Sequence, residues 1–400
     1  MKPVTLISGI NNMSIFYYQN KKFYFFGDLH EQNQHSCDQE YACDYFNYDF
    51  SHVETHGSSC TTIGPLLFYW FNYNNANGIH TDFLFEESYT KKNERQYYQY
   101  FKQIVDIRKS QHVNVLSTIF PRKDMSWLAL TGALLQPCLY KNKDKCKYQY
   151  VHMHNVDIRA LEGEKVSPFS LIFLEEELQS FYPPDIKDEL IFIVKTLLYR
   201  YRDIIKALVD DYDDDLKTIY DDLFKSLYYL KPIYQQQVNL MKQMYINNTH
   251  IIATELKKLN SGIRHNIINF ILHLSDDYIK PIIDQFDQWI NKWFYYFDNE
   301  TPDEQLNTLT LLLTTYMNHF TVLAAYTMDI YVLCKLFLAE GDDVIVYTGA
   351  YHIEVYNLFF KQLTEPIFES KTYEHRKCIQ FDQLPKYLNV NQFREFYYII

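Results

Sequence analysis

Two Gly-x-x-His elements near opposite ends of the 400-residue chain constrain its fold most strongly. The first, residues 27–30, follows the β-like apolar run 23–26, and the second, residues 349–352, follows the run 344–347. The chain holds ten glycines, well below the roughly 7% that is usual in proteins. Two glycines in the same place before a histidine are therefore not filler, and the pattern predicts one site built from both ends of the chain.

The first part of the chain alternates β-rich runs with turns and helical stretches. The expected strands are 14–18, 22–26, 83–86, 113–120 and 148–152, and the expected helix is 62–74. Strand, helix and strand in this order predict an α/β fold with a mostly parallel central sheet and crossover helices.

Long helical periodicity then runs from 167 to 340, with prolines such as Pro281 expected to divide it into separate helices. A β pattern returns at 344–347. We therefore expect residues 1–400 to form a single α/β domain with a large helical insertion before the final core strands. Its parts are 1–166, the N-terminal half of the sheet; 167–340, the helical insertion; and 341–400, the C-terminal strands and helix that complete the core.

Charge and hydropathy limit the classes of partner that the chain is expected to bind. The formal charge of −12, from 50 acidic and 38 basic residues, opposes binding to phosphate backbones, so no nucleic-acid partner is expected. The apolar stretch 321–339 contains Asp329 and Lys335, and charges near the middle of a bilayer are costly. This stretch is expected to be a core helix, with no membrane span in the chain.

Seven cysteines without a Cys-x-x-Cys pair, and a start that lacks a secretory signal, predict reduced thiols and an intracellular location. The surplus of Tyr (37) and Phe (29) resembles proteins from AT-rich genomes, including those of large DNA viruses. A viral origin would place the protein in host cytoplasm or in a virion.

Ionisable residues follow several expected strands. His30 and His352 close the Gly-x-x-His elements, Asp28 lies inside the first, and Glu86 ends the strand 83–86. Ligands of parallel sheets bind at the carboxyl ends of the strands, and imidazoles with carboxylates suit a divalent metal or acid–base work. The alternative is two ordinary turn histidines and a solvent-facing glutamate.

A further polar group follows the expected strand 148–152. Asp157 is suited to orienting an imidazole, and Arg159 to binding a substrate carboxylate or phosphate. His152 and His154 alternate along the same strand, which places them on one face. A plain hydrogen-bonded sheet edge would explain these residues equally well.

The ordered segments FFGDLHEQ, FLFEES, VHMHNVDIR, MDIYVLCKLF and VIVYTGAYHIEVY resemble the TraB, Tiki, ChaN and erythromycin-esterase-like superfamily. The resemblance implies an α/β core interrupted by helices, with a metal-assisted or histidine-based hydrolytic site. On it, His30 and His352 match the motif histidines, and Glu86 matches the strand-end glutamate. Asp157 and Arg159 match the polar element between them.

The leading hypothesis is a metal-dependent hydrolase, peptidase or esterase-like, acting on a small molecule or peptide. His30, Glu86 and His352, with Asp28 beside them, would hold a divalent metal ion of unknown identity. One alternative is a non-catalytic viral structural or interaction protein that keeps the scaffold, with the candidate residues more than about 8 Å apart, too far for metal bonds near 2 Å. Another is a metal-free acid–base enzyme that uses the same histidines and Asp157.

Overall fold

The computed structural model describes the parts of the chain that carry most of these predictions. The described residues are 6–28, 60–86, 131, 132, 135, 138, 146–158, 202, 203, 205, 206, 208, 246–297, 301, 304, 322, 325–371 and 378–380. The chain divides into two compact units. Unit 1 is Met1–Asp157 with Ala339–Ile400, and unit 2 is Ile158–Leu338. Unit 2 corresponds in sequence to the expected helical insertion, and a single domain spanning both units stays a prediction.

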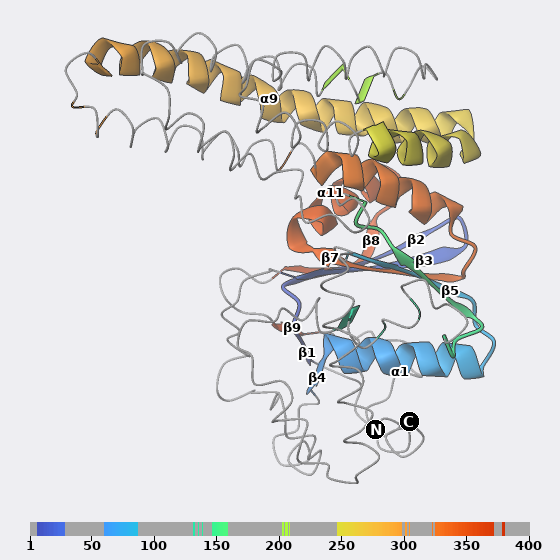
Figure 1. Cartoon of the computed structure of the whole chain (residues 1–400). Helices are drawn as coiled ribbons and strands as arrows, with labels where there is room; N and C mark the ends of the chain where they lie inside the picture. Colours follow the sequence, from blue (N-terminus) through green and yellow to red (C-terminus); the bar gives the residue numbers. More distant parts are fainter. Residues whose placement is uncertain are drawn as a thin grey trace, which may run out of the picture. The chain divides into compact units, whose positions relative to one another are not determined.

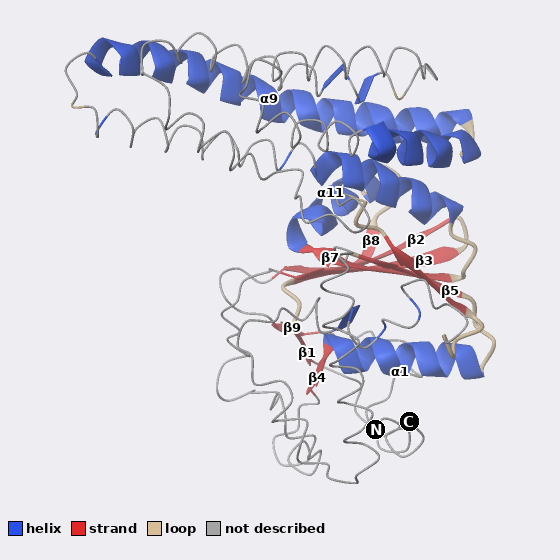
Figure 2. Cartoon of the chain, viewed as in Figure 1, coloured by secondary structure: helices blue, strands red, loops and turns tan. Residues whose placement is uncertain are grey.

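A six-stranded sheet forms the centre of unit 1 (Figures 1 and 2). Its strands, in spatial order, are β6 (Val151–Asn155), β5 (Thr81–Phe85), β7 (Asp343–Gly349), β3 (Lys21–Asp28), β2 (Asn12–Tyr18) and β8 (Pro366–Lys371). Strands β6, β5, β7 and β3 pair in parallel, whereas β2 is antiparallel to both β3 and β8. The described fold is therefore α/β with a mixed sheet, and its parallel part carries the candidate residues.

One face of this sheet packs against α1 (Ile63–Ala76) and a small second sheet (Figure 1). The small sheet has the order β4 (Cys60–Thr62), β1 (Leu6–Ser8) and β9 (Cys378–Gln380). The buried residues of α1 recur at helical spacing and form its core face: Ile63, Leu66, Leu67, Trp70 and Phe71. They join Phe83 and Phe85 of β5 in one apolar core, so the even-numbered residues of β5 point to the opposite face.

The opposite face of the sheet is covered over β2, β3 and β7 by α11 (Ala350–Phe360). The ring of Phe360 lies 4.8 Å from that of Phe23 and 5.1 Å from that of Phe25, between centroids. The buried Ser14 hydroxyl also donates a hydrogen bond to Asn357. These contacts fix the helix whose first turn carries the second Gly-x-x-His element.

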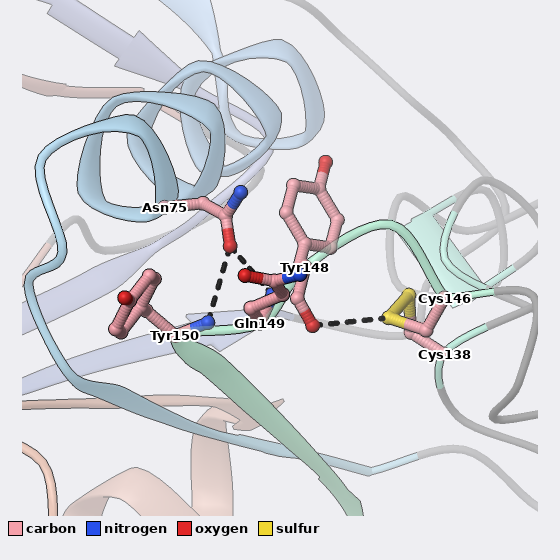
Figure 3. The surroundings of a disulfide bond; sticks show 6 residues. All are labelled: Asn75, Cys138, Cys146, Tyr148, Gln149 and Tyr150. Atoms are coloured by element: carbon pink, nitrogen blue, oxygen red, sulfur yellow. Dashed lines mark hydrogen bonds between the residues drawn. A yellow bond between two sulfur atoms is a disulfide. The ribbon is translucent and has the colours of Figure 1, made fainter.

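The predicted strands near the site are confirmed, but some of their starts are displaced, and β5 begins at Thr81, two residues earlier than expected. Strand β6 begins at Val151 and not at residue 148, where the apolar pattern predicted it. The reason is local: the backbone N–H groups of Gln149 and Tyr150 donate to Asn75 Oδ1 of α1 at 2.6 and 3.1 Å (Figure 3). The segment before β6 is thus bound to a helix side chain. The strand expected at 113–120 lies outside the described residues.

Unit 2 contains one helix where the sequence pattern predicted two. Pro281 lies inside α9 (Ser261–Phe297), so the expected break at this proline is wrong. Proline removes one backbone hydrogen bond of a helix, but the apolar face continues across it through the buried Ile279, Ile282 and Ile283. Burial on that face outweighs the local defect.

The apolar stretch near the end of unit 2 is helical over residues 325–338, with Asp329 buried. In the ranges that the structure describes, no helix combines the length and apolar character that crossing a bilayer requires.

The prediction that all thiols are reduced is wrong for one pair. Cys138 and Cys146 form a disulfide across a sequence separation of 8 residues, just before β6 (Figure 3). Cys138 belongs to a helical segment, and the chain returns beside it before β6, with a Cα–Cα distance of 4.6 Å. The spacing along the chain gave no hint of this because the pair is brought together by the fold. Cys334 is a free, buried cysteine.

Candidate functional site

The two Gly-x-x-His elements begin side by side on neighbouring parallel strands. In the register of β3 and β7, Gly27 lies opposite Thr348 and Asp28 opposite Gly349. The carboxyl ends of both strands therefore meet at one edge of the sheet, although they come from opposite ends of the chain.

Gly27 is required by the close approach of these two elements. A Cβ atom at this position would lie 1.6 Å from Asn12 Oδ1 and 2.9 Å from the backbone Cα of Ala350. Asn12 cannot simply move away, because its Nδ2 donates a hydrogen bond to the Ala350 carbonyl at 3.1 Å. Glycine is thus the residue that lets the end of β3 contact the start of α11.

Glu86 and His352 form the centre of the site. Glu86 directly follows β5, and its Oε1 lies 3.4 Å from His352 Nε2, with side-chain exposures of 5% and 6%. The other oxygen, Oε2, accepts a hydrogen bond from the Gly349 N–H at 2.7 Å. Gly349 is the N-cap of α11, where the helix dipole favours a negative charge. The carboxylate is therefore held by the backbone while one oxygen faces the imidazole.

Two tyrosines of α11 surround the imidazole of His352. The ring of Tyr356 is nearly parallel to it, with an interplanar angle of 22° and centroids 6.5 Å apart. The ring of Tyr351 lies edge-on at 5.9 Å. Tyr356 is fully buried, whereas Tyr351 is 41% exposed. One tyrosine thus supports the imidazole from the core, and the other lies partly in solvent beside it.

Asp28 and Asp157 end two further parallel strands of the same sheet. Asp28 is the last residue of β3 and is 1% exposed. Asp157 follows β6 and is half-buried, and its N–H donates to Asn155 Oδ1 at 3.1 Å. Strand β6 ends level with β5, because the Val156 N–H donates to the Phe85 carbonyl at 2.9 Å. Carboxylates therefore lie at or just after the ends of three of the four parallel strands, and His352 lies just after the remaining strand, β7.

His30 and Arg159 lie outside the described residues, so the structure places neither side chain. Among the residues that are described, no three histidine, cysteine or acidic side chains already form a group that could hold a metal ion. Of the expected ligands, Glu86 and His352 are in contact, whereas Asp28 does not form a three-residue metal-binding group with them.

Asp82 is a functional candidate that sequence reasoning missed. Its Oδ1 lies 2.9 Å from His154 Nε2 and 3.9 Å from His152 Nδ1. Its Oδ2 accepts the N–H groups of Glu340 and Gly341 at 2.8 and 2.7 Å. His152 and His154 thus share one face of β6, as their alternation predicted. The acid found beside them is Asp82, whereas the sequence suggested Asp157 as the orienting acid.

The alternation of side chains along β5 is the sequence signal that could have placed Asp82 on the same face as Glu86. Asp82, Leu84 and Glu86 occupy every second position, so they share the face opposite the Phe83 and Phe85 core. The expected strand began at residue 83, one residue too late to include Asp82.

The charge of Asp82 is stabilised in its buried position. Burial by itself raises the pKa of this carboxyl group. The hydrogen bond and charge of His154, together with the N–H groups of Gly341 and Glu340, outweigh burial and bring the pKa below its usual value. Asp82 is therefore an ionised side chain that is 3% exposed.

The fold and these residues define an α/β protein with a buried carboxylate–imidazole pair at the carboxyl ends of parallel strands. The chain matches no protein-family model, no curated protein and no solved structure. Its function is therefore inferred from the geometry of the site.

Proposed function

We propose that this protein is a metal-dependent hydrolase whose reaction centre lies at the carboxyl ends of β3, β5 and β7. The observation that carries this proposal is the buried contact between Glu86 and His352, 3.4 Å apart. Burying a carboxylate and an imidazole is costly unless they are paired or bind an ion. The same strand ends carry Asp28, and the first Gly-x-x-His element leads to His30.

The described pair fits a divalent metal ion in spacing and in chemistry. Two ligand atoms of a tetrahedral zinc ion, each about 2.0–2.1 Å from the metal, lie about 3.3 Å from one another. The distance of 3.4 Å between Glu86 Oε1 and His352 Nε2 agrees with this value. The Gly349 N–H donates to Glu86 Oε2 and so orients the carboxylate, as groups hydrogen-bonded to metal ligands commonly do. In this proposal His30, Glu86, His352 and Asp28 hold the ion.

Other residues of the site would transfer the proton, bind the substrate and position the imidazole. A bound divalent ion would lower the pKa of a coordinated water towards about 7. Asp157 accepts the proton of the attacking water and returns it to the leaving group, while Arg159 binds an anionic part of the substrate. Tyr356 keeps the imidazole of His352 in place from the core side.

A metal-free acid–base enzyme is the second candidate, and the same contact supports it. A buried carboxylate beside an imidazole is also how hydrolases orient a histidine base. In that version His352 takes the proton of water and Glu86 stabilises the imidazolium. Resistance of the activity to a chelator would distinguish it from the metal-dependent version. The non-catalytic alternative requires separated residues, and the short distance from Glu86 to His352 weighs against it.

We also propose that the complete sheet is mostly parallel and that the substrate is a small molecule or a peptide. An intracellular or virion location is included in the proposal, although the Cys138–Cys146 disulfide is more typical of oxidising compartments than of cytosol.

The test is a hydrolysis assay of the full chain with chromogenic carboxylic esters, peptide anilides and phosphate esters, before and after EDTA treatment. We expect activity on one class that EDTA removes and added Zn²⁺ or Mn²⁺ restores. Glu86→Gln and His352→Gln should lower it by about 100-fold or more. The matched controls are Glu369→Gln and His250→Gln, which change exposed side chains elsewhere. Wild-type activity in Glu86→Gln and His352→Gln would overturn the proposal.

A further inference from the structure

We propose that His152 and His154 of β6 form a second metal site, which chelates a divalent transition-metal ion of the zinc type. This site is independent of the proposed hydrolytic centre and uses none of its residues. Imidazole is a preferred ligand of zinc, copper and nickel ions. The structure supports the inference through the spacing of the two histidines, their exposure and the acid behind them.

The spacing of the two histidines suits chelation. Residues two apart on a strand point to the same face, with Cα atoms about 6.6–7 Å apart. His154 Nε2 and His152 Nδ1 lie 2.9 and 3.9 Å from Asp82 Oδ1, so both rings lie on the same face of β6 beside Asp82, and of the two only His154 is within hydrogen-bond distance of it. Their side chains are 48% and 35% exposed, which leaves them accessible to an ion from solution. Strand β6 is the edge of the described sheet.

Asp82 provides the carboxylate that ligating histidines usually have behind them. A metal-bound histidine typically donates its other ring N–H to a carboxylate, which fixes the tautomer and orientation of the ring. Here His154 Nε2 lies 2.9 Å from Asp82 Oδ1, so Nδ1 is the nitrogen presented to an ion. The N–H groups of Glu340 and Gly341 bind the other oxygen of Asp82. The carboxylate is thus fixed before any ion arrives.

The second site is separate from the first along the same strand. Asp82 and Glu86 are four residues apart on one face of β5, which corresponds to about 13 Å. A single ion cannot contact both. Because no group of three ligating side chains is preformed in the described ranges, the protein would supply two imidazoles and water would complete the shell. Such a site binds less tightly than a closed structural one and keeps open positions.

The test is a Zn²⁺ titration of the full chain by calorimetry, with His152→Gln and His154→Gln as variants and His250→Gln as the control. We expect each variant to weaken one binding event by at least about tenfold, while the control leaves it unchanged. His152 is the safer substitution for folding because its side chain is half-exposed. Wild-type Zn²⁺ affinity in both variants would overturn the second site.

A spectroscopic measurement separates ligation from a structural role. The measurement uses His352→Ala as the background, so that the proposed hydrolytic centre no longer offers two imidazoles to the probe. With Cu²⁺, electron paramagnetic resonance should show nitrogen coupling from two imidazoles in this background and from one when His152→Gln is added. Identical spectra would contradict the proposal.

Discussion

Asp82 and Glu86 lie on one face of β5 and bind the two ends of the neighbouring strand β7. Asp82 accepts the N–H groups of Glu340 and Gly341, just before that strand, and Glu86 accepts the N–H of Gly349 at its end. Each acid also faces a histidine, His154 or His352. One strand therefore organises two carboxylate–imidazole pairs, and the same contacts set the position of the strand that leads into α11.

Gly27→Ala should destabilise the protein. The new methyl group would collide with Asn12 Oδ1 and with the Ala350 backbone, so either the hydrogen bond from Asn12 to Ala350 is lost or α11 shifts. We expect the free energy of unfolding to fall by about 1–3 kcal/mol, measured by urea denaturation. Gly262→Ala is the control, because its Cβ would meet Asn260 Oδ1 at an ordinary 3.5 Å. Equal stability of Gly27→Ala and the wild type would refute the close approach.

Asp82→Asn should cost stability in a pH-dependent way. The folded-state pKa of Asp82 lies below its unfolded value, which is about 3.9. The stabilisation is therefore complete at neutral pH and is lost as the pH falls through the folded-state pKa. We expect a loss of about 2–3 kcal/mol at pH 7 for the variant, shrinking below about pH 4. Urea unfolding across this range measures the difference.

The pH dependence of stability should have the opposite sign for Asp343→Asn. Burial raises the pKa of Asp343 more than Lys22, Asn74 and Trp70 lower it. Its ionised form is thus disfavoured in the folded state, and wild-type stability relative to this variant should fall as the pH rises above about 4. Parallel pH profiles for the Asp82 and Asp343 variants would contradict the assigned environments.

Alkylation should separate three cysteines by their environments. Burial, with the negative charge of Glu255, raises the pKa of the Cys334 thiol, so iodoacetamide should not label it in the folded protein. After unfolding without reductant, Cys334 should react while Cys138 and Cys146 stay protected as a disulfide. Mass spectrometry of the peptides reads the result. Labelling of Cys138 and Cys146 without reductant would show that the disulfide is absent.

The sequence predicted the elements whose patterns are local. The buried residues of α1 recur at helical spacing, and β2, β3, β5 and β7 were visible as apolar runs, with β7 at residues 343–349. The ends of these elements were predicted less accurately. Strand β6 starts late because a side chain of α1 binds the segment before it, and no pattern within that segment reports such a contact.

Contacts between distant residues were predicted where the sequence repeated a motif. The duplicated Gly-x-x-His elements brought His352 into the predicted site, and Glu86 followed from its strand end. Asp82 was missed because its partners are backbone N–H groups near residue 340 and two histidines of β6. The Pro281 break was wrongly predicted because burial along α9 outweighs the missing hydrogen bond.

The metal content of the purified full chain, measured by elemental analysis after dialysis, tests the proposed reaction centre most directly. We expect one tightly held ion per chain in the wild type and in His154→Gln, because the two-imidazole site is too weak to survive dialysis. Glu86→Gln and His352→Ala should lose this ion. A wild-type metal content in both of these variants, or a wild type that holds no ion when purified with Zn²⁺ or Mn²⁺, would contradict a metal centre at Glu86 and His352.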